Sequence, residues 1–408
     1  MPSWTLLPSH HRWLAAHAQG LLAFGRRTPY PGGGAAWLDD EGSPLLERGV
    51  ETWITARTVH VYSIGSLLGV PGCRPVAQAA LAGLRGPLRD EEHGGWYPAV
   101  AADGTPAAGK TAYAHAFVVL AGSSATAAGL DGAPELLADA LAVFERRFWD
   151  DEAGRAVDTW DTAFTTLDGY RGLNANMHTV EAFLAAADVT GERLWLERAA
   201  RVAAFAASSA AGNGWRLPEH FGPDWTPLPE YNDDRRDDRF KPYGATVGHG
   251  LEWARLMLHV EAAYDTAAGD TDWLGAARAL FERAVADGWA PDGADGFLYT
   301  TDWHGNPVVR DRMHWVTAEA IGAAAALYTR TADEEYAAWY ARAWDYAQRY
   351  LVDHEHGSWH HQLTPGNTPT GTVWPGKPDL YHAFQATLIP RLPLAPSVAT
   401  AVARGLLQ

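Results

Sequence analysis

A turn that combines acidic residues with glycine returns five times along the chain, and this repeat restricts the possible folds more than any other feature. Successive turn glycines are about 59, 60, 82 and 61 residues apart, and they stand at Gly95, Gly154, Gly214, Gly296 and Gly357. The long interval contains a strongly polar insertion at residues 230–243. Helical stretches fill the intervals, and each turn leads into an aromatic or extended run. A period of this length is typical of tandem supersecondary units.

One helix of each predicted pair carries polar residues near its start. The series advances in steps of 56, 65, 71, 65 and 68 residues through Arg57, Tyr113, His178, His249, His314 and His382. The pattern predicts an all-α fold in which six helix pairs close into an (α/α)6 barrel, with short β-hairpin-like loops at one end. Such a barrel would gather the polar clusters at one mouth and make residues 1–408 a single catalytic domain. An open solenoid of helix hairpins, the alternative, would spread them along a line.

Composition excludes several classes of function. The 408 residues carry a net charge of −17 without a basic block, which argues against nucleic acid and anionic membranes as partners. Cys73 is the only cysteine, so no intrachain disulfide can form and a reducing cytoplasm is compatible. No signal-peptide pattern and no membrane-spanning apolar run is found, so we expect a cytoplasmic protein. The 19 Trp and 15 Tyr could stack on sugar rings or fill the core.

The stretch from Gly248 to Glu252 is the most informative of the polar clusters. His249 and Glu252 are three residues apart on a predicted helix, so they share one face and the carboxylate could hold the tautomer of the imidazole. Glycines on both sides of His249 would leave room for a ligand close to the backbone. A hydrogen-bonded core histidine is the alternative interpretation of His249 taken alone. The recurrence of similar helix entrances favours a site.

Other chemistries are weaker matches to the sequence. His-x-x-Glu occurs at His178 and at His249, but di-metal bundles use the reverse order, so we expect no metal. Histidines near residues 354–361 flank a turn and are expected to be solvated. A hydrolase would need two facing carboxylates, for which Glu252, Glu319 and Asp161 are candidates. Clustered histidines instead suit proton transfer near neutral pH.

The ordered set of motifs resembles the N-acylglucosamine 2-epimerase superfamily, and within it the branch of mannose and sulfoquinovose isomerases. The resemblance extends over nearly the whole chain. Its motifs are Trp53-x-x-x-Arg57-x-x-His60, Lys110-x-x-Tyr113-x-x-Ala116-Phe117, Asn174-x-x-Met177-His178-x-x-Glu181, Gly248-His249-x-x-Glu252 and Lys377-Pro378-Asp379-x-Tyr381-His382-x-x-Gln385.

The resemblance implies an (α/α)6 barrel, sugar isomerisation or epimerisation without metal or cofactor, and two catalytic histidines that map to His249 and His382. Together with the residue patterns it gives Glu252 as the residue that orients His249. The expected substrate-binding residues are Arg57, Trp53, Tyr113, Asn174, His178, Glu181, Trp315, Glu319, Trp374, Lys377 and Gln385.

We therefore expect an aldose–ketose isomerase that interconverts D-mannose and D-fructose, or a related aldose such as lyxose, through a cis-enediol. A sugar 2-epimerase, a sulfoquinovose isomerase and a non-catalytic sugar-binding protein are the alternatives. A sulfonated sugar would need a cationic subsite, which Arg236, Arg239 or Lys377 could supply. The expected partner is one small monosaccharide, and the sequence leaves open whether the protein is a monomer or a homo-oligomer.

Overall fold

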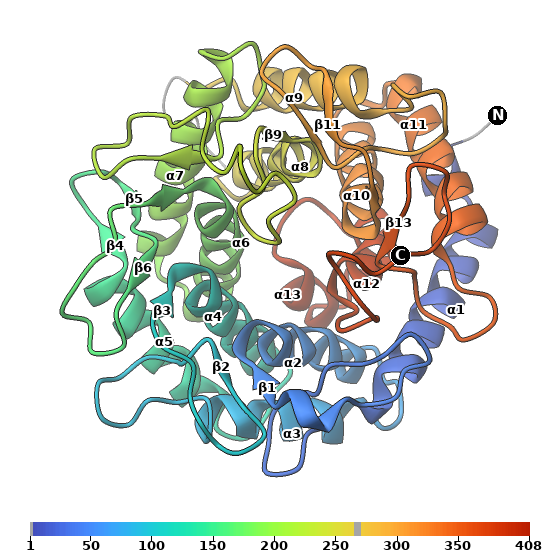
Figure 1. Cartoon of the computed structure of the whole chain (residues 1–408). Helices are drawn as coiled ribbons and strands as arrows, with labels where there is room; N and C mark the ends of the chain where they lie inside the picture. The colour runs from blue at the N-terminus through green and yellow to red at the C-terminus, as the bar shows by residue number, and fades with distance from the viewer. Residues whose placement is uncertain (1–2, 265–270) are drawn as a thin grey trace.

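The computed structural model describes residues 3–264 and 271–408, and it shows two concentric rings of helices (Figure 1). The inner ring consists of α2 (Thr52–Leu67), α4 (Ala112–Ala127), α6 (Leu173–Thr190), α8 (Val247–Ala263), α10 (His314–Thr331) and α12 (Tyr381–Leu388). The outer ring consists of α1 (Pro8–Phe24), α3 (Cys73–Arg85), α5 (Ala133–Arg147), α7 (Arg193–Ala211), α9 (Trp273–Gly288) and α11 (Glu334–Tyr346). The predicted (α/α)6 barrel is confirmed.

The two rings differ in their pattern of burial. The inner helix α2 buries every residue from Thr52 to Gly65, because neighbours surround it on all sides. The outer helix α3 buries only one stripe, which includes Val76, Ala80 and Leu84, as expected for an amphipathic helix whose other face meets water. The ring closes where α12 packs against both α1 and α2, so the two ends of the chain complete the sixth pair.

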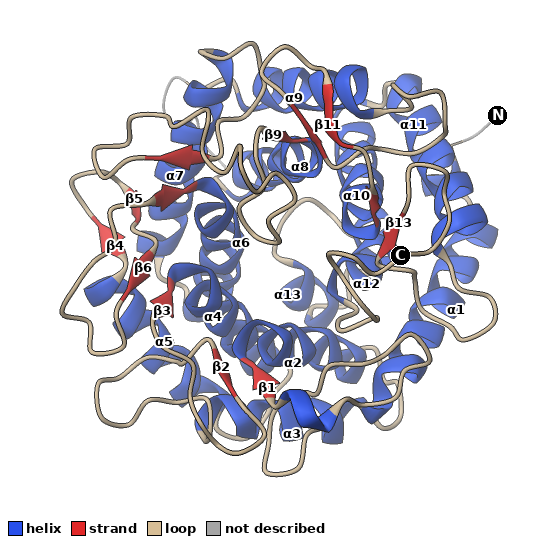
Figure 2. Ribbon diagram, in the orientation of Figure 1, coloured by secondary structure: helices blue, strands red, loops and turns tan. Residues whose placement is uncertain are grey.

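Short antiparallel ladders tie successive repeats together (Figure 2). Each of five ladders joins the segment before an inner helix to the segment after the following outer helix. The pairs are β1 (Val50–Glu51) with β2 (Ala99–Val100), β3 (Lys110–Thr111) with β6 (Thr159–Trp160), β7 (Arg171–Gly172) with β8 (His220–Phe221), β9 (Ala245–Thr246) with β10 (Thr300–Thr301), and β12 (Arg312–Met313) with β13 (Gln362–Leu363). In addition, β4 (Trp149–Asp150) pairs with β5 (Arg155–Ala156), and β11 (Pro307–Val309) with β10.

Buried cations fasten three of the turns that the sequence pattern identified. Lys110 donates to Asp90 over 2.6 Å, Arg312 to Asp292 over 2.6 Å, and Lys377 to Asp353. In each case the cation precedes an inner helix and the carboxylate lies in the turn after the preceding outer helix. The five glycines of the repeat all have positive φ, between 60° and 103°, which explains why glycine recurs there.

A short helix, α13 (Val398–Ala403), lies across the end of the barrel remote from the ladders and contacts α2, α4 and α6. Within residues 3–264 and 271–408, every helix is too short or too polar to traverse a lipid bilayer.

Candidate active site

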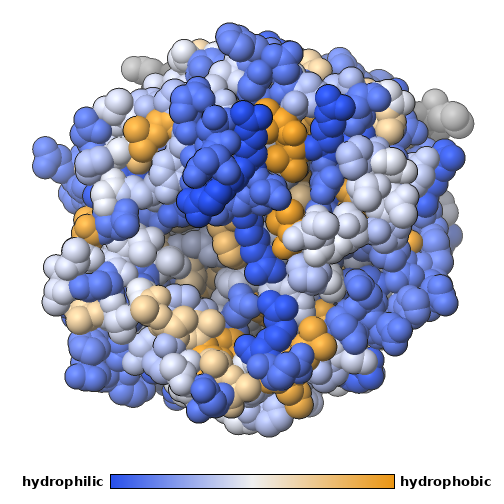
Figure 3. Space-filling model, in the orientation of Figure 1, coloured by the Kyte–Doolittle hydropathy of each residue, from blue (hydrophilic) through white to orange (hydrophobic). Residues whose placement is uncertain are grey.

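The N-terminal turns of the inner helices surround a small cavity at the mouth of the barrel. A space-filling view of this face shows a hollow near the centre, bordered by both hydrophilic and hydrophobic residues (Figure 3). The cavity is lined by Arg57, Tyr113, Asn174, His178, Arg239, Phe240, His249, Glu252, Tyr299, His314, Trp315, His361, Trp374, Asp379 and His382.

A carboxylate from the preceding repeat holds His249. The Nδ1 atom of His249 lies 2.9 Å from Oε2 of Glu219, which directly precedes β8. The expectation that Glu252 orients this ring is therefore wrong: Glu252 lies near His178 and Arg255 instead. Because a carboxylate only accepts, Nδ1 carries a proton, and in the neutral form of the ring Nε2 keeps its lone pair. Among the described residues, that Nε2 atom has no hydrogen-bond partner.

His382, on the helix α12 where the ring closes, is held by a carboxylate in the same way. Its Nδ1 atom lies 3.0 Å from Oε1 of Glu319 on α10. Burial, reinforced by the nearby Arg57 cation, holds the pKa of His382 well below its usual range, so the ring is neutral at pH 7. In the part of the chain that the structure describes, Nε2 of His382 is likewise unpaired, which leaves a lone pair directed to the cavity.

Trp315 lies between the two histidines. Its ring centroid is 5.2 Å from that of His249 and 5.8 Å from that of His382, with tilted planes in both contacts. Gly248 makes this packing possible, because a Cβ atom there would lie 2.2 Å from Cζ3 of Trp315. Gly250 faces Ala284 on α9. The expectation that these glycines leave room for a ligand is therefore wrong: protein atoms occupy the space.

Arg57 supplies a fixed positive charge to the cavity. Its guanidinium donates to Oδ2 of Asp379 over 3.2 Å and to the Tyr113 hydroxyl over 3.0 Å. It also lies 4.4 Å from the ring centroid of Phe117 and 4.6 Å from that of Tyr381. Hydrogen bonds and aromatic faces together restrict its orientation, as a group that positions a polar ligand requires.

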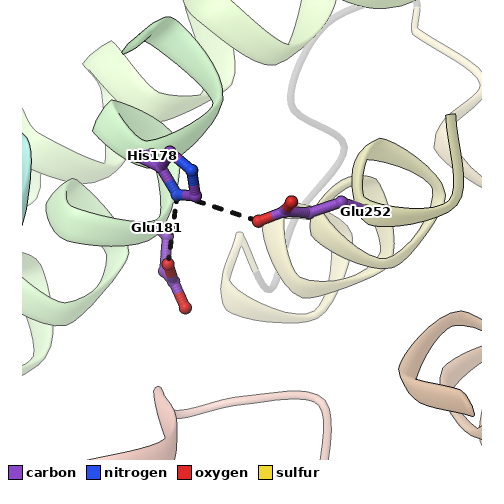
Figure 4. Close-up of side chains that lie close together, drawn as sticks. All are labelled: His178, Glu181 and Glu252. Carbon is purple, nitrogen blue, oxygen red and sulfur yellow. Dashed lines mark ion pairs between the residues drawn. The ribbon is translucent and has the colours of Figure 1, made fainter. Parts of the chain in front are cut away.

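Two carboxyl groups lie close to His178 in the interior of the barrel. Figure 4 shows His178 and Glu181 on α6 facing Glu252 on α8, with Nδ1 of His178 3.8 Å from one carboxylate oxygen of each. These three residues are the group best placed to bind a metal, since their ligand atoms lie within 4.8 Å of one another. However, Glu181 already accepts hydrogen bonds from Tyr381 and Gln385, and the Arg255 guanidinium lies 3.7 Å from Glu252. A neighbouring cation disfavours a divalent ion there.

Most of the candidates from the sequence come together at this cavity. Those that line it are Arg57, Tyr113, Asn174, His178, His249, Glu252, Trp315, Trp374 and His382. Glu181, Glu319 and Gln385 lie one layer deeper, where they contact residues that line it or border it. Trp53 does not line the cavity but packs against two residues that do: its ring centroid is 6.0 Å from that of Trp374 and 6.1 Å from that of Phe240.

Lys377 is the candidate that the structure removes from the site. Its ammonium group is fully buried and donates to Asp353 and to the Gly357 carbonyl, 2.9 Å away. It fastens a turn, so the expectation that it binds substrate is wrong. Arg236 is also occupied, because it pairs with Asp233 at 2.6 Å. Of the three cations proposed for a sulfonate, only Arg239 reaches the cavity, where its guanidinium lies 4.6 Å from the Trp37 ring and 4.3 Å from Trp374.

Sequence reasoning missed several groups in this site, among them Phe240 and Tyr299 of the cavity wall and two that contact the histidine series. Glu219 stands outside the helical series, and only the ladder between β7 and β8 brings it to His249. His361 was expected to be solvated with its neighbours, but it is buried and stacks on His314 at a centroid distance of 3.9 Å. His361 directly precedes β13, and β13 pairs with β12 at the start of α10. This position in the repeat indicates that His361 lies near His314.

The fold is a helical barrel with two histidines at its mouth, each hydrogen-bonded to a carboxylate. This arrangement is typical of an enzyme that moves protons on a small polar molecule.

Residues 33–386 match the family described as N-acylglucosamine 2-epimerase, and the chain belongs to this family. It is 54% identical over 407 residues to a D-mannose isomerase of Thermobifida fusca, with 99% of each chain covered. A D-mannose isomerase of Pseudomonas cannabina pv. alisalensis is 46% identical, with 98% of this chain and 97% of the relative covered.

Solved structures show the same relationship. The crystal structure of a D-mannose isomerase superposes with a TM-score of 0.85 at 28% identity and covers 92% of this chain and 96% of its own. A cellobiose 2-epimerase from Spirochaeta thermophila has a TM-score of 0.80 at 23% identity, with 94% and 96% covered, which shows a shared fold.

Proposed function

We propose that this protein is an aldose–ketose isomerase that interconverts D-mannose and D-fructose, working as one catalytic domain over residues 1–408. The observation that carries the proposal is the histidine pair: His249 and His382 flank Trp315, each has Nδ1 on a carboxylate, and within the described chain neither Nε2 has a hydrogen-bond partner. The two relatives that match nearly the whole chain support mannose as the substrate.

The reaction moves hydrogen between neighbouring carbons of the open-chain sugar. In the first step Nε2 of His382 removes the C2 proton, the electron pair of that bond forms the C1–C2 double bond, and O1 gains a proton. In the second step the O2–H proton leaves, the C2–O2 double bond forms and C1 gains a proton. His249 is the acid–base partner, and the two histidines can exchange these roles. Such groups typically contribute on the order of 10²–10⁴-fold to the rate.

Arg57 and His178 complete the chemistry that we propose. A guanidinium beside the enediol oxygens stabilises the negative charge that develops there. It is most effective when it is already oriented and does not have to move during the reaction. The contacts of Arg57 with Asp379 and Tyr113 supply that rigidity. Burial lowers the pKa of His178 to about 4, so His178 is neutral and can donate a hydrogen bond without adding charge. No step requires a metal, and we expect activity to survive exhaustive chelation; recovery of lost activity by one divalent ion would contradict this.

Arg239 supports a second candidate, an isomerase of a sulfonated sugar such as sulfoquinovose. Its guanidinium faces the cavity and, among the described residues, has no carboxylate partner. Comparing kcat/KM for mannose and sulfoquinovose, in the wild type and in Arg239→Gln, separates the two. A loss confined to the sulfonated sugar would identify it as the natural substrate class.

The decisive experiment is incubation with mannose in D₂O, followed by NMR. We expect fructose with deuterium at C1, at less than full incorporation if one histidine carries the proton between carbons, and glucose late or not at all. Glucose labelled at C2 from the start, without free fructose, would identify a 2-epimerase. No turnover of any aldose would indicate a non-catalytic sugar-binding protein.

A further inference from the structure

A buried arginine lies directly behind the catalytic pair. Arg255 on α8 is only 2% exposed, and its Nε donates to Oε2 of Glu319 over 3.0 Å, while one terminal nitrogen lies 2.9 Å from the same oxygen in an ion pair. The other oxygen of Glu319 lies 3.0 Å from Nδ1 of His382. Each oxygen of this carboxylate therefore has its own partner: Oε2 contacts Arg255 and Oε1 contacts His382.

We propose that Arg255 is a positioning residue that acts through Glu319: it keeps this carboxylate ionised and oriented, so that His382 presents the lone pair of Nε2 to the substrate. This inference rests on the proposed acid–base role of His382 and extends it to a residue that does not line the substrate cavity.

The electrostatic surroundings of Glu319 explain why an arginine is needed. The charged and titratable groups of the described chain that face it are Arg255, Glu252 and His259 from α8, Glu181 and His178 from α6, and His382 from α12. Burial raises the pKa of Glu319, and Arg255 is the cation that opposes this rise. Burial and the Glu319 charge raise the pKa of Glu252 well above its usual range, so protonation of Glu252 would relieve the repulsion between the two carboxyl groups.

Loss of Arg255 would change the tautomer of His382. Without the cation, Glu319 would take up a proton, and a protonated carboxyl group can donate to Nδ1 of His382. The imidazole would then carry its own proton on Nε2, the atom that must act as the base. The same reasoning predicts that raising the pH restores activity, because it removes the proton from Glu319.

The test compares Arg255→Gln with Arg255→Lys and with Arg198→Gln. Arg198 is a matched control, because it is also a buried arginine in an ion pair, 2.8 Å from Glu145, but it lies in the outer ring. We expect Arg255→Gln to lose about 10- to 100-fold in kcat, the usual range for partners of site residues, with little change in KM. The acid limb of its pH profile should move to higher pH, and Arg255→Lys should move it less.

A double-mutant cycle decides whether the effect passes through Glu319. If it does, Arg255→Gln/Glu319→Gln should be no slower than Glu319→Gln alone. If the losses of the two single variants multiply in the double variant, the proposal is overturned. It is also overturned if Arg255→Gln keeps the wild-type pH profile and loses only as much activity as Arg198→Gln. If Arg255→Gln does not fold, Arg255→Lys gives the same comparison with the charge retained. All rates are measured with an aldose that the wild type converts. If the wild type makes no fructose, the proposed substrate is rejected, but the ratio of variant to wild-type rates still tests the role of Arg255.

Discussion

The two histidines that we propose as acid–base groups are each held by a carboxylate of the preceding repeat. Glu219 holds His249, and Glu319 holds His382, through Nδ1 in both cases. The equivalence predicts that Glu219→Gln should reduce kcat by about 10- to 100-fold, because the amide does not fix the Nδ1–H tautomer. Steady-state kinetics with circular dichroism measure this, and unchanged turnover would show that another group orients His249.

Two glycines on either side of His249 give a second test at the residue scale. Gly248→Ala places a Cβ atom 2.2 Å from Trp315, whereas Gly250→Ala places one 3.5 Å from Ala284, an ordinary contact. We expect Gly248→Ala to displace the ring between the histidines and to cost on the order of 10²-fold in kcat/KM, as misplacement by about 1 Å can. Gly250→Ala should keep activity and gain about 0.5–1 kcal/mol in helix stability. Equal effects of the two variants would contradict this account of Trp315.

Among the elements, the segment before each inner helix fixes where that helix begins. Lys377 before α12 and Lys110 before α4 are both fully buried against a turn carboxylate. Removing one partner of a buried pair leaves an uncompensated charge, so Lys377→Met and Lys110→Met should each lower the free energy of unfolding by about 3–5 kcal/mol. Thermal or urea unfolding measures this. A raised KM with unchanged stability in Lys377→Met alone would instead make Lys377 a substrate-binding residue.

The helices and their polar entrances follow from the sequence because their signals are local. Comparison of the repeats gives their period, and the turn glycines and the positions of His249 and His382 are visible within single repeats. The partners of these histidines are not, since Glu219 is 30 residues and Glu319 63 residues away, in other repeats. A local carboxylate such as Glu252 was the obvious candidate partner, and only the ladder geometry shows that Glu219 reaches the ring.

At the scale of the whole molecule, closure of the ring gives the protein a core that buries many ionisable groups. His60, His178, His259 and His314 come from four different inner helices, and burial lowers the pKa of each to about 4. Sequence alone identifies such histidines but not their burial, because burial depends on neighbours from other repeats. The low pKa values also keep these rings neutral at pH 7.

This burial predicts an acid-labile protein. An unfolded histidine has a pKa of about 6.5, so between pH 6.5 and 4 the unfolded state binds more protons than the folded state, and stability must fall as the pH falls. Each of the four histidines should contribute a loss on the order of 1–2 kcal/mol by pH 5. Glu252 and Glu319 act in the opposite sense, because their raised pKa values favour the folded state as the pH falls, but two carboxyl groups do not offset four imidazoles. We therefore expect the melting temperature to decrease steadily from pH 7 to pH 5. His259→Gln, remote from the mouth, should flatten that dependence, and an equal slope in this variant would show that the buried histidines are not its cause.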